Sequence, residues 1–317
     1  MQQRFVGRSG LKVSRLALGT LTWGQGTDEF EAKDQLTSFV SAGGTLVDTA
    51  AGYADGTAES MLGELLAGTV SRSDVLIATK AGISRARGTR EVDVSRRALL
   101  ATLEASLRRL GVDSVDLWQV HTWSDDVPWE ETLAALDQAV SSGRAAYVGV
   151  SNYAGWQSAQ AQAWQRAVPG RTALVSNQVE YSLLNRRVEQ ETVPAALASG
   201  MSILPWSPLG RGVLTGKYRS GTPNDSRAAS THFANYVGAY LDDRSARIVE
   251  SVTRAAEGLD MSPLEVSLAW VRDRPAVAAP IVGARTTTQL KASLAVEEIA
   301  LPAEIVAALD DVSGEGD

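Results

Sequence analysis

Residues 45–60 read TLVDTAAGYADGTAES, and this stretch gives the first sign of both the fold and the chemistry of the chain. Its opening, TLVDTA, is a short apolar run of the kind that forms a buried strand, and the small residues after it mark a turn. Asp48 stands where the chain is about to leave the core, and Tyr53 follows the turn. The stretch therefore predicts a strand that brings a carboxylate to its carboxyl end.

Seven more apolar runs have the length of strands and are bounded by turn residues: 14–20, 74–80, 115–121, 146–152, 173–181, 201–207 and 278–284. They are continuously apolar, which is typical of parallel strands covered on both faces. Helical patterns separate them. The clearest spans 93–111, with a leucine every three or four residues and Gly111 just past its end; another spans 127–143 and stops at Gly143.

One strand and one helix recur about every 30 residues, which is the size of a βα unit. Eight such units predict an α/β fold, a (β/α)₈ TIM barrel that takes up residues 1–317 as a single domain. A doubly wound open sheet is the rival fold, and it would normally carry a glycine fingerprint after its first strand. Residues 21–30, LTWGQGTDEF, lack the third glycine of that fingerprint.

Two segments depart from the plain repeat. Residues 4–14, RFVGRSGLKVS, are short, alternating and centred on a turn, so they predict an N-terminal β-hairpin that plugs the floor of the barrel. Residues 208–238 form a long loop between strands seven and eight that is rich in glycine, serine and asparagine. A loop of this length is usually functional, and we expect a lid.

Composition excludes several classes of function. The net charge of −7 and the lack of clustered basic residues argue against a nucleic-acid partner. There is no cysteine, so the chain has no disulfide, no thiolate nucleophile and no cysteine-bound metal. No apolar run has the length of a signal peptide core or a membrane span, so we expect a cytoplasmic protein without a membrane partner. The sequence does not indicate an oligomeric state.

The predicted strands end in polar residues that the TIM barrel would gather at one rim: Asp48, Lys80, His121, Ser151, Asn152, Gln178, Trp206, Ser207 and Arg285. Each has an ordinary explanation, because an aspartate often caps a helix, a lysine is often a solvated end and a histidine can be a satisfied core group. Capping does not, however, call for a lysine and a histidine on the next two strands. The joint occurrence favours an active site.

These groups suit one kind of chemistry. Asp48 and Lys80 come from adjacent strands and can form an ion pair that keeps the ammonium charged. The ammonium should lower the pKa of Tyr53 from its ordinary value near 10 and make it a proton donor near neutral pH. His121 can donate a hydrogen bond to a substrate oxygen and polarise a carbonyl. The site would protonate an oxygen as charge develops on it.

Eight segments, in order along the chain, resemble the aldo-keto reductase superfamily, and above all its bacterial branch: SGLKVSRLALGTLTWG (9–24), TLVDTAAGYADGTAESMLGELL (45–66), LIATKAG (76–82), SLRRLGVDSVDLWQVH (106–121), GRAAYVGVSNY (143–153), NQVEYSLLNR (177–186), LPWSPLGRGVLTGKYR (204–219) and PIVGARTTTQL (280–290). The resemblance implies an enzyme that reduces an aldehyde, ketone or sugar carbonyl with NADPH. It implies a catalytic tetrad of Asp48, Tyr53, Lys80 and His121, with Tyr53 as proton donor to the carbonyl oxygen.

The resemblance also implies the cofactor-binding residues: Thr20, Ser151, Asn152, Gln178, Trp206, Ser207, Leu209, Gly210, Gly212, Lys217, Gly283, Arg285 and Gln289. Among them, Trp206 would stack on the nicotinamide and residues 207–212 would wrap the pyrophosphate. Arg285 offers a planar cation for a 2′-phosphate, which favours NADPH over NADH. Ser293 stands where related sequences usually have an asparagine at the adenine.

The substrate residues are less well defined. Trp23 and Trp123 are candidates for the walls of an apolar pocket, although Trp123 can nearly as well pack beneath loops. A different function is also open, because the β-subunits of voltage-gated potassium channels resemble this chain and use bound nucleotide as a signal with slow turnover. A metal-dependent barrel enzyme is a third hypothesis. Two histidines, one of them His232 in the long loop, provide few ligands for it, and we expect no metal site.

Overall fold

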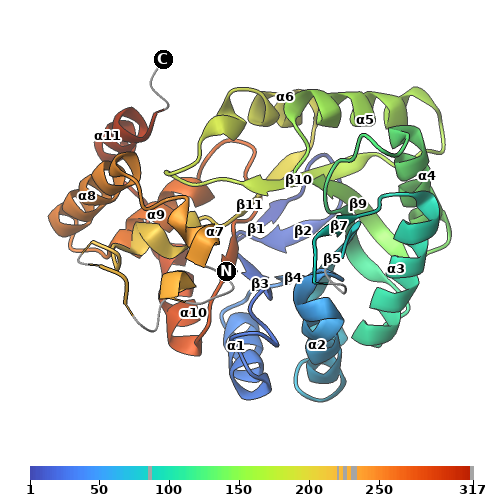
Figure 1. Ribbon diagram of the computed structural model, residues 1–317, viewed down its shortest axis with the longest axis horizontal. Helices are drawn as coiled ribbons and strands as arrows, with labels where there is room; N and C mark the ends of the chain where they lie inside the picture. The colour runs from blue at the N-terminus through green and yellow to red at the C-terminus, as the bar shows by residue number, and fades with distance from the viewer. Residues whose placement is uncertain (85–87, 220, 224–226, 230–233, 315–317) are drawn as a thin grey trace.

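The computed structural model describes residues 1–84, 88–219, 221–223, 227–229 and 234–314. At its centre eight parallel strands are ordered β11-β10-β9-β8-β5-β4-β3-β12 (Figure 1). Their bounds are β3 Ala17–Gly19, β4 Leu46–Asp48, β5 Leu76–Ala81, β8 Val115–Val120, β9 Ala145–Ser151, β10 Leu174–Glu180, β11 Ser202–Trp206 and β12 Ile281–Gly283. Ile203 of β11 bonds to the backbone of Ala276 and Ala278 just before β12, which brings the two ends of the sheet together. The predicted barrel is confirmed.

Helices surround the strands (Figure 1). Ten of the described helices have at least eight residues: α1 Glu29–Ser41, α2 Thr57–Gly68, α3 Arg96–Leu110, α4 Trp129–Ser141, α5 Gly155–Ala167, α6 Thr192–Ser199, α8 Asp243–Gly258, α9 Pro263–Arg272, α10 Thr287–Leu294 and α11 Ala303–Ser313. In α3 the Ser95 side chain accepts from the amide of Ala98. Gly111 caps the other end at φ 66°, where the sequence predicts the helix to stop. None of the helices in the described ranges is both long and apolar enough to cross a membrane.

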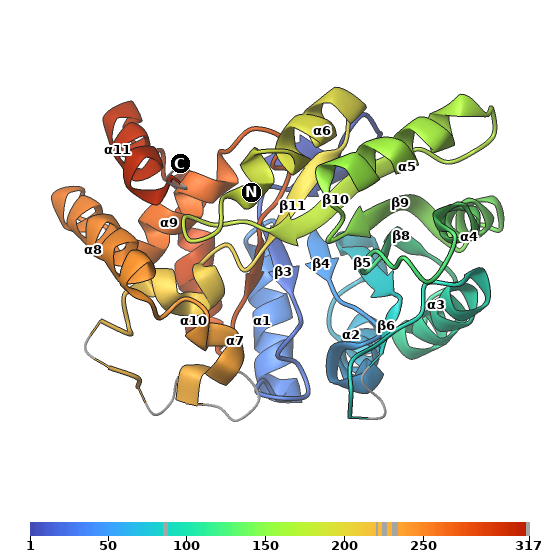
Figure 2. The same cartoon turned by 45° about the horizontal axis from the view of Figure 1, so that its top comes forward.

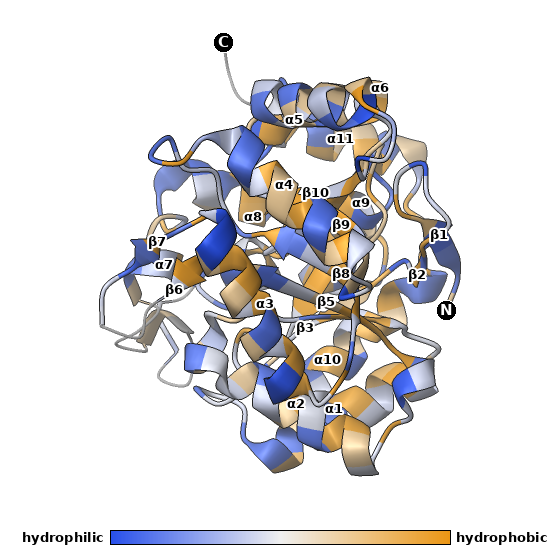
Figure 3. Cartoon of the chain, turned by 90° about the vertical axis from the view of Figure 1, so that its right-hand side faces the viewer, coloured by the Kyte–Doolittle hydropathy of each residue, from blue (hydrophilic) through white to orange (hydrophobic). Residues whose placement is uncertain are grey.

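The predicted hairpin forms from β1 (Gln3–Phe5) and β2 (Lys12–Ser14), paired antiparallel. Val6, Leu11 and Val13 are buried and pack in one cluster with apolar residues of the barrel strands, among them Leu46 and Leu117. The hairpin therefore fills the floor of the barrel. Figure 3 shows it on the opposite side of the molecule from β6, β7 and α7.

Ion pairs attach this N-terminal segment to the C-terminal part of the chain. Arg4 donates to Asp273 at 2.7 Å, and Arg15 donates to Glu297 at 2.9 Å. The hairpin also comes very close to the sheet at Gly7, which has φ 58°; a Cβ there would lie 2.6 Å from the carbonyl oxygen of Val175. Only glycine fits such a position without displacing the backbone.

The long loop contains more structure than predicted. It includes the short helices η4 (Gly210–Thr215), η5 (Arg227–Ala229) and α7 (Ala234–Gly238), whereas His232 lies outside the described residues. A second feature not foreseen from the sequence is the small antiparallel pair of β6 (Ile83–Ser84) and β7 (Glu91–Val92) directly after β5. In Figure 2, α7 and β6 both lie below the central strands, so these additions share one end of the barrel.

Candidate active site

Asp48 and Lys80 form the predicted ion pair at the carboxyl ends of β4 and β5. The Lys80 ammonium donates to Asp48 Oδ2 at 2.8 Å and to the carbonyl oxygen of Thr49 at 2.7 Å, and both charged side chains are buried. Asp48 Oδ1 accepts from Gln178 Nε2 at 2.8 Å. Burial is the largest single effect and opposes the charge on Lys80, but Asp48 and Tyr53 together outweigh it, so the pKa of Lys80 is raised from its ordinary value. The lysine therefore remains charged.

Tyr53 completes the contacts of this lysine. Its hydroxyl lies 3.4 Å from the Lys80 ammonium, which also lies 4.9 Å from the centre of the phenol ring. The His121 ring meets the Tyr53 ring edge-on at 6.0 Å, and the His121 amide donates to Ala81 at the end of β5. The four residues predicted as a tetrad are thus gathered at one point of the barrel rim, although Asp48 and His121 lie far apart in the sequence.

The expected lowering of the pKa of Tyr53 is wrong. Burial of the phenol raises its pKa above the ordinary value of 10.0. The Lys80 ammonium does favour the tyrosinate, as expected, but Asp48 beside it acts in the opposite sense and burial is the largest effect. The cation is visible in the sequence as Lys80, whereas the burial of the phenol is not. Tyr53 is accordingly protonated at neutral pH.

Asn152 connects the histidine side of the site to Trp206. Its side-chain amide donates to the His121 carbonyl oxygen at 2.9 Å and its Oδ1 accepts from Trp206 Nε1 at 3.0 Å. The Ser151 hydroxyl donates to the carbonyl oxygen of Gln178 at 2.8 Å. Thr20, also buried, has its hydroxyl 3.2 Å from the carbonyl oxygen of Asp48. Asn152 also donates to the Ser151 hydroxyl at 3.1 Å, so the predicted residues at the ends of β3, β4, β9, β10 and β11 share one continuous hydrogen-bonded rim.

The loop after β11 is coiled by residues in the left-handed region. Ser207, Gly210, Arg211 and Gly212 have φ values of 51°, 54°, 59° and 93°, and Leu209 accepts from the amide of Gly212 within the same turn. A Cβ on Gly212 would lie 3.4 Å from the Lys217 ammonium. A glycine-rich turn next to an ammonium is a suitable cradle for a phosphate, because the backbone can approach it closely.

Arg211 fastens this turn to β10 and to a later part of the long loop. Its guanidinium pairs with both oxygens of Glu180, at 2.8 and 2.7 Å, and lies over the rings of Tyr236 and Tyr240 at 4.0 and 4.7 Å. The Tyr236 hydroxyl is 2.9 Å from that of Ser207. Apart from Ser207, none of these residues is among the predicted site residues. The available signal was Glu180, a second acid at a strand end, two residues after Gln178.

The predicted adenosine end follows β12. Gly283 is exposed, and the amide of Arg285 donates to Gln289 Oε1 at 3.0 Å. Within the described part of the chain, the Arg285 guanidinium makes no hydrogen bond or ion pair, so a cation is available here. The Ser293 hydroxyl donates to the Gln289 carbonyl oxygen of its own helix at 3.2 Å. Glu31 of α1 accepts from the amide of Thr287 at 3.0 and 3.1 Å, which puts a carboxylate at the same helix end.

The two tryptophans predicted to contact substrate differ in position. Trp23 is fully buried, and its indole nitrogen donates to Gln35 at 3.1 Å; a side chain without exposed surface cannot wall an open pocket, so that expectation is corrected. Trp123 is only partly buried. It packs edge-on against Tyr153 at 5.1 Å and Trp156 at 5.6 Å, near His121. Only Trp123 is placed to border the site.

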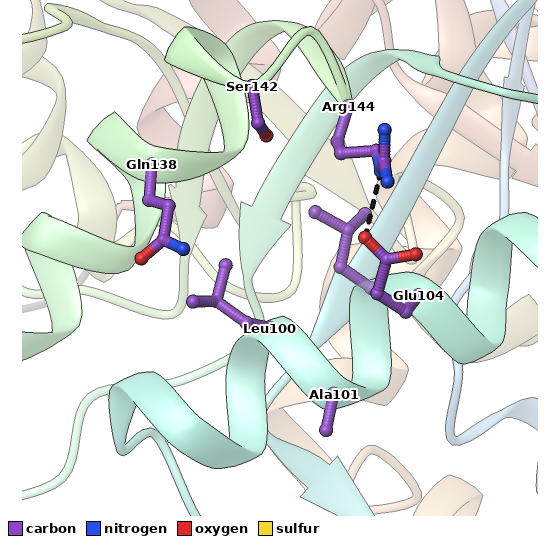
Figure 4. Close-up of a pocket in the computed structure, with 7 residues that line it drawn as sticks. Leu100, Ala101, Glu104, Gln138, Ser142 and Arg144 are labelled. Carbon is purple, nitrogen blue, oxygen red and sulfur yellow. Dashed lines mark hydrogen bonds and ion pairs between the residues drawn. The ribbon is translucent and has the colours of Figure 1, made fainter.

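A surface hollow lies elsewhere, between α3 and α4 in the outer layer (Figure 4). The charged residues among those lining it are Glu104 and Arg144, which pair with each other at 2.8 Å. No residue of the rim described above contributes to it. No group of three or more potential metal ligands occurs in the ranges that the structure describes. The rim at the carboxyl ends of the strands is therefore the best candidate for chemistry.

Comparison with known proteins agrees with this geometry. The model of the aldo/keto reductase family matches residues 15–313. The chain is 35% identical to the uncharacterized oxidoreductase YrpG of Bacillus subtilis (strain 168), with 98% of this chain and 96% of that protein covered. It is 36% identical to a probable voltage-gated potassium channel subunit beta of Oryza sativa subsp. japonica, with 92% and 89% covered. It is 30% identical to the L-glyceraldehyde 3-phosphate reductase of Escherichia coli (strain K12), with 100% and 94% covered.

Proposed function

The chain belongs to the aldo/keto reductase family, and from this premise we propose that it reduces an aldehyde, ketone or sugar carbonyl to the alcohol with NADPH. One observation carries the proposal. The buried Lys80 ammonium contacts both the carboxylate of Asp48 and the hydroxyl of Tyr53. A phenol held against a permanent cation is suited to give up a proton to a substrate oxygen and to exist briefly as tyrosinate.

Each of the four residues has a task in this mechanism. Tyr53 is protonated at neutral pH because burial raises its pKa, so it can donate the proton to the carbonyl oxygen. Lys80 then stabilises the tyrosinate that remains, and Asp48 keeps the ammonium charged and oriented. His121, whose ring meets that of Tyr53, would donate a hydrogen bond to the same oxygen. The bound dinucleotide would supply the hydride that forms the new C–H bond.

The rim and the loops after β11 and β12 would hold that cofactor. Ser151, Asn152 and Gln178 offer polar groups for the carboxamide, and Trp206 offers a ring for the nicotinamide. The turn 207–212 and Lys217 would bind the pyrophosphate. Gly283, Arg285 and Gln289 would bind the adenosine end, with the guanidinium of Arg285 on the 2′-phosphate.

A second candidate function rests on the relatives. A potassium channel β-subunit is as similar to this chain as the oxidoreductase is, at 36% and 35% identity. A nucleotide-sensing subunit would need the cofactor site and little turnover. The buried Asp48–Lys80 pair does not separate the two functions, because a channel subunit of this family can contain it as well. The reductase is preferred because the chain is similar over nearly its whole length to an oxidoreductase and to a glyceraldehyde-phosphate reductase.

Titration with NADPH and NADH, followed by tryptophan fluorescence, tests binding at Trp206. Turnover against a panel of aldehydes, ketones and sugars, followed by absorbance of the cofactor, tests the reaction. We expect tighter binding of NADPH and oxidation of the cofactor by at least one class of carbonyl. Tight binding without turnover of any carbonyl would favour the nucleotide-sensing function, and no binding of either dinucleotide would contradict both.

A further inference from the structure

Glu59 of α2 is a fully buried acid to which the proposed reaction assigns no task. Its Oε1 accepts from the hydroxyl of Thr79 at 2.5 Å. Its Oε2 accepts from Nε and Nη2 of Arg109 at 2.8 and 2.6 Å. A carboxylate removed from water must have both oxygens paired to be tolerated. Glu59 therefore joins α2 to β5, through Thr79, and to the last turn of α3, through Arg109.

The first of these bonds acts next to Lys80. Successive residues of a strand point to opposite faces, so Thr79 points out of the barrel while Lys80 points into it. The hydroxyl bond from Thr79 to Glu59 holds this part of β5 from the outside. The position of the Lys80 backbone is in this way tied to the carboxylate of Glu59.

The second bond acts on the turn that carries Tyr53. Ala54, Asp55 and Gly56 have φ values of 47°, 52° and 92°, a conformation that persists only where the surroundings hold it. A Cβ on Gly56 would lie 2.7 Å from Nε of Arg109, so the guanidinium packs directly on this turn. Glu59 orients that guanidinium, and it does so from the first helical turn after Gly56.

We propose that Glu59 is a positioning residue that sets the separation of Tyr53 and Lys80. Tyr53 and Lys80 are 3.4 Å apart, and the Glu59 carboxylate holds the backbone on both sides of this contact. It holds the Lys80 strand through Thr79 and the Tyr53 turn through Arg109. The inference rests on the proposed function, because the separation matters for rate only if Tyr53 delivers the proton. Glu59 itself touches neither Tyr53 nor Lys80 in the contacts described above.

Two variants weaken the link, and two serve as controls. Glu59→Gln removes the charge, and Thr79→Val removes only the hydroxyl. Thr79→Ser retains that hydroxyl. Asp116→Asn is the matched control at the other end of β5: Asp116 Oδ2 accepts from Arg72 at 2.7 Å and from the amide of Ile77 at 2.8 Å, so it too ties this strand to an arginine.

For each variant we would measure kcat, the Kd for NADPH and the alkaline titration of Tyr53, assigned by difference from Tyr53→Phe. We expect Glu59→Gln and Thr79→Val to lower kcat at least tenfold and to change the Kd less than twofold. Their Tyr53 titration should move to higher pH, because the Lys80 ammonium would lie farther from the phenol and would stabilise its ionised form less. Thr79→Ser and Asp116→Asn should retain the wild-type kcat and titration, even where Asp116→Asn lowers Tm.

Wild-type kcat and wild-type titration in both Glu59→Gln and Thr79→Val would overturn the inference. If Glu59→Gln does not fold, Thr79→Val decides between the two results alone. The Tyr53 titration requires no turnover, so it separates this inference from the proposed function. A wild-type protein that reduces no carbonyl refutes the function, whereas a Tyr53 titration that is unmoved in both Glu59→Gln and Thr79→Val refutes the role of Glu59.

Discussion

The two halves of the site are built in different ways. On the side of Asp48, Lys80 and His121, the polar groups stand at strand ends and hold one another through buried side-chain contacts. The other side consists of residues 207–212 and 283–289. Its shape comes from the left-handed backbone of 207–212, and its charge comes from Arg285, whose guanidinium has no partner among the described residues. The first half is a set of mutually fixed side chains, and the second is a shaped loop surface. Substitutions should therefore affect rate and stability in the first half and affinity in the second.

Removal of the Tyr53 hydroxyl should have the largest effect on the first half. Tyr53→Phe keeps the ring packing and removes the proposed acid, so we expect kcat for carbonyl reduction to fall about 10³-fold. The Kd for NADPH should change less than twofold, because the ring remains. Steady-state turnover and fluorescence titration check both values. Unchanged turnover would remove Tyr53 from the role of proton donor.

Lys80→Met should disturb stability as well as rate. It leaves the buried carboxylate of Asp48 with Gln178 as its remaining side-chain partner, so the free energy of unfolding should fall by about 3–5 kcal/mol. Urea unfolding measures the loss. The double variant with Asp48→Asn removes the buried charge and should regain part of the stability. If the single variant proves as stable as the wild type, the first half is not held together by this pair.

Arg285→Ala tests the second half and should act on affinity alone. A charged contact of the guanidinium with a 2′-phosphate is worth about 2 kcal/mol, so the Kd for NADPH should rise about 30-fold. The Kd for NADH, which lacks that phosphate, and the unfolding transition should hardly change. Parallel titrations with the two dinucleotides make the comparison. Equal losses for both would rule out the 2′-phosphate contact.

The smallest expected effect concerns pH. Tyr53 must be protonated to act, and its raised pKa keeps it so; the pKa of Lys80 is also raised, so its charge is constant. The reduction rate should therefore change less than about twofold between about pH 7.5 and 9.5 and decline only when the pH rises through the pKa of Tyr53. Pre-steady-state hydride transfer provides the measurement. A decline well below pH 9 would show that the ammonium dominates over burial after all.

The same difference between the halves explains what could be predicted from the sequence. Asp48, Lys80 and His121 were found because each stands at the end of an apolar run, and parallel strands bring their carboxyl ends to one rim. The pairing of Glu59 with Arg109 and of Arg211 with Tyr236 joins residues 50 and 25 positions apart by helix and loop packing that no local pattern encodes. Burial was the other missing quantity. It accounts for the errors at Trp23 and at the pKa of Tyr53.

The ties between the hairpin and the C-terminal segment bear on how the chain is made. Arg4 and Arg15 leave the ribosome well before their partners Asp273 and Glu297, which lie 269 and 282 positions later in the sequence. At translation rates of 5–20 residues per second, the hairpin waits on the order of half a minute for them. During that time Val6, Leu11 and Val13 cannot be fully buried, because the barrel strands that they pack against are not all present. Until the segment that contains Asp273 and Glu297 emerges, this apolar surface stays exposed on the nascent chain, and such surface is what chaperones bind.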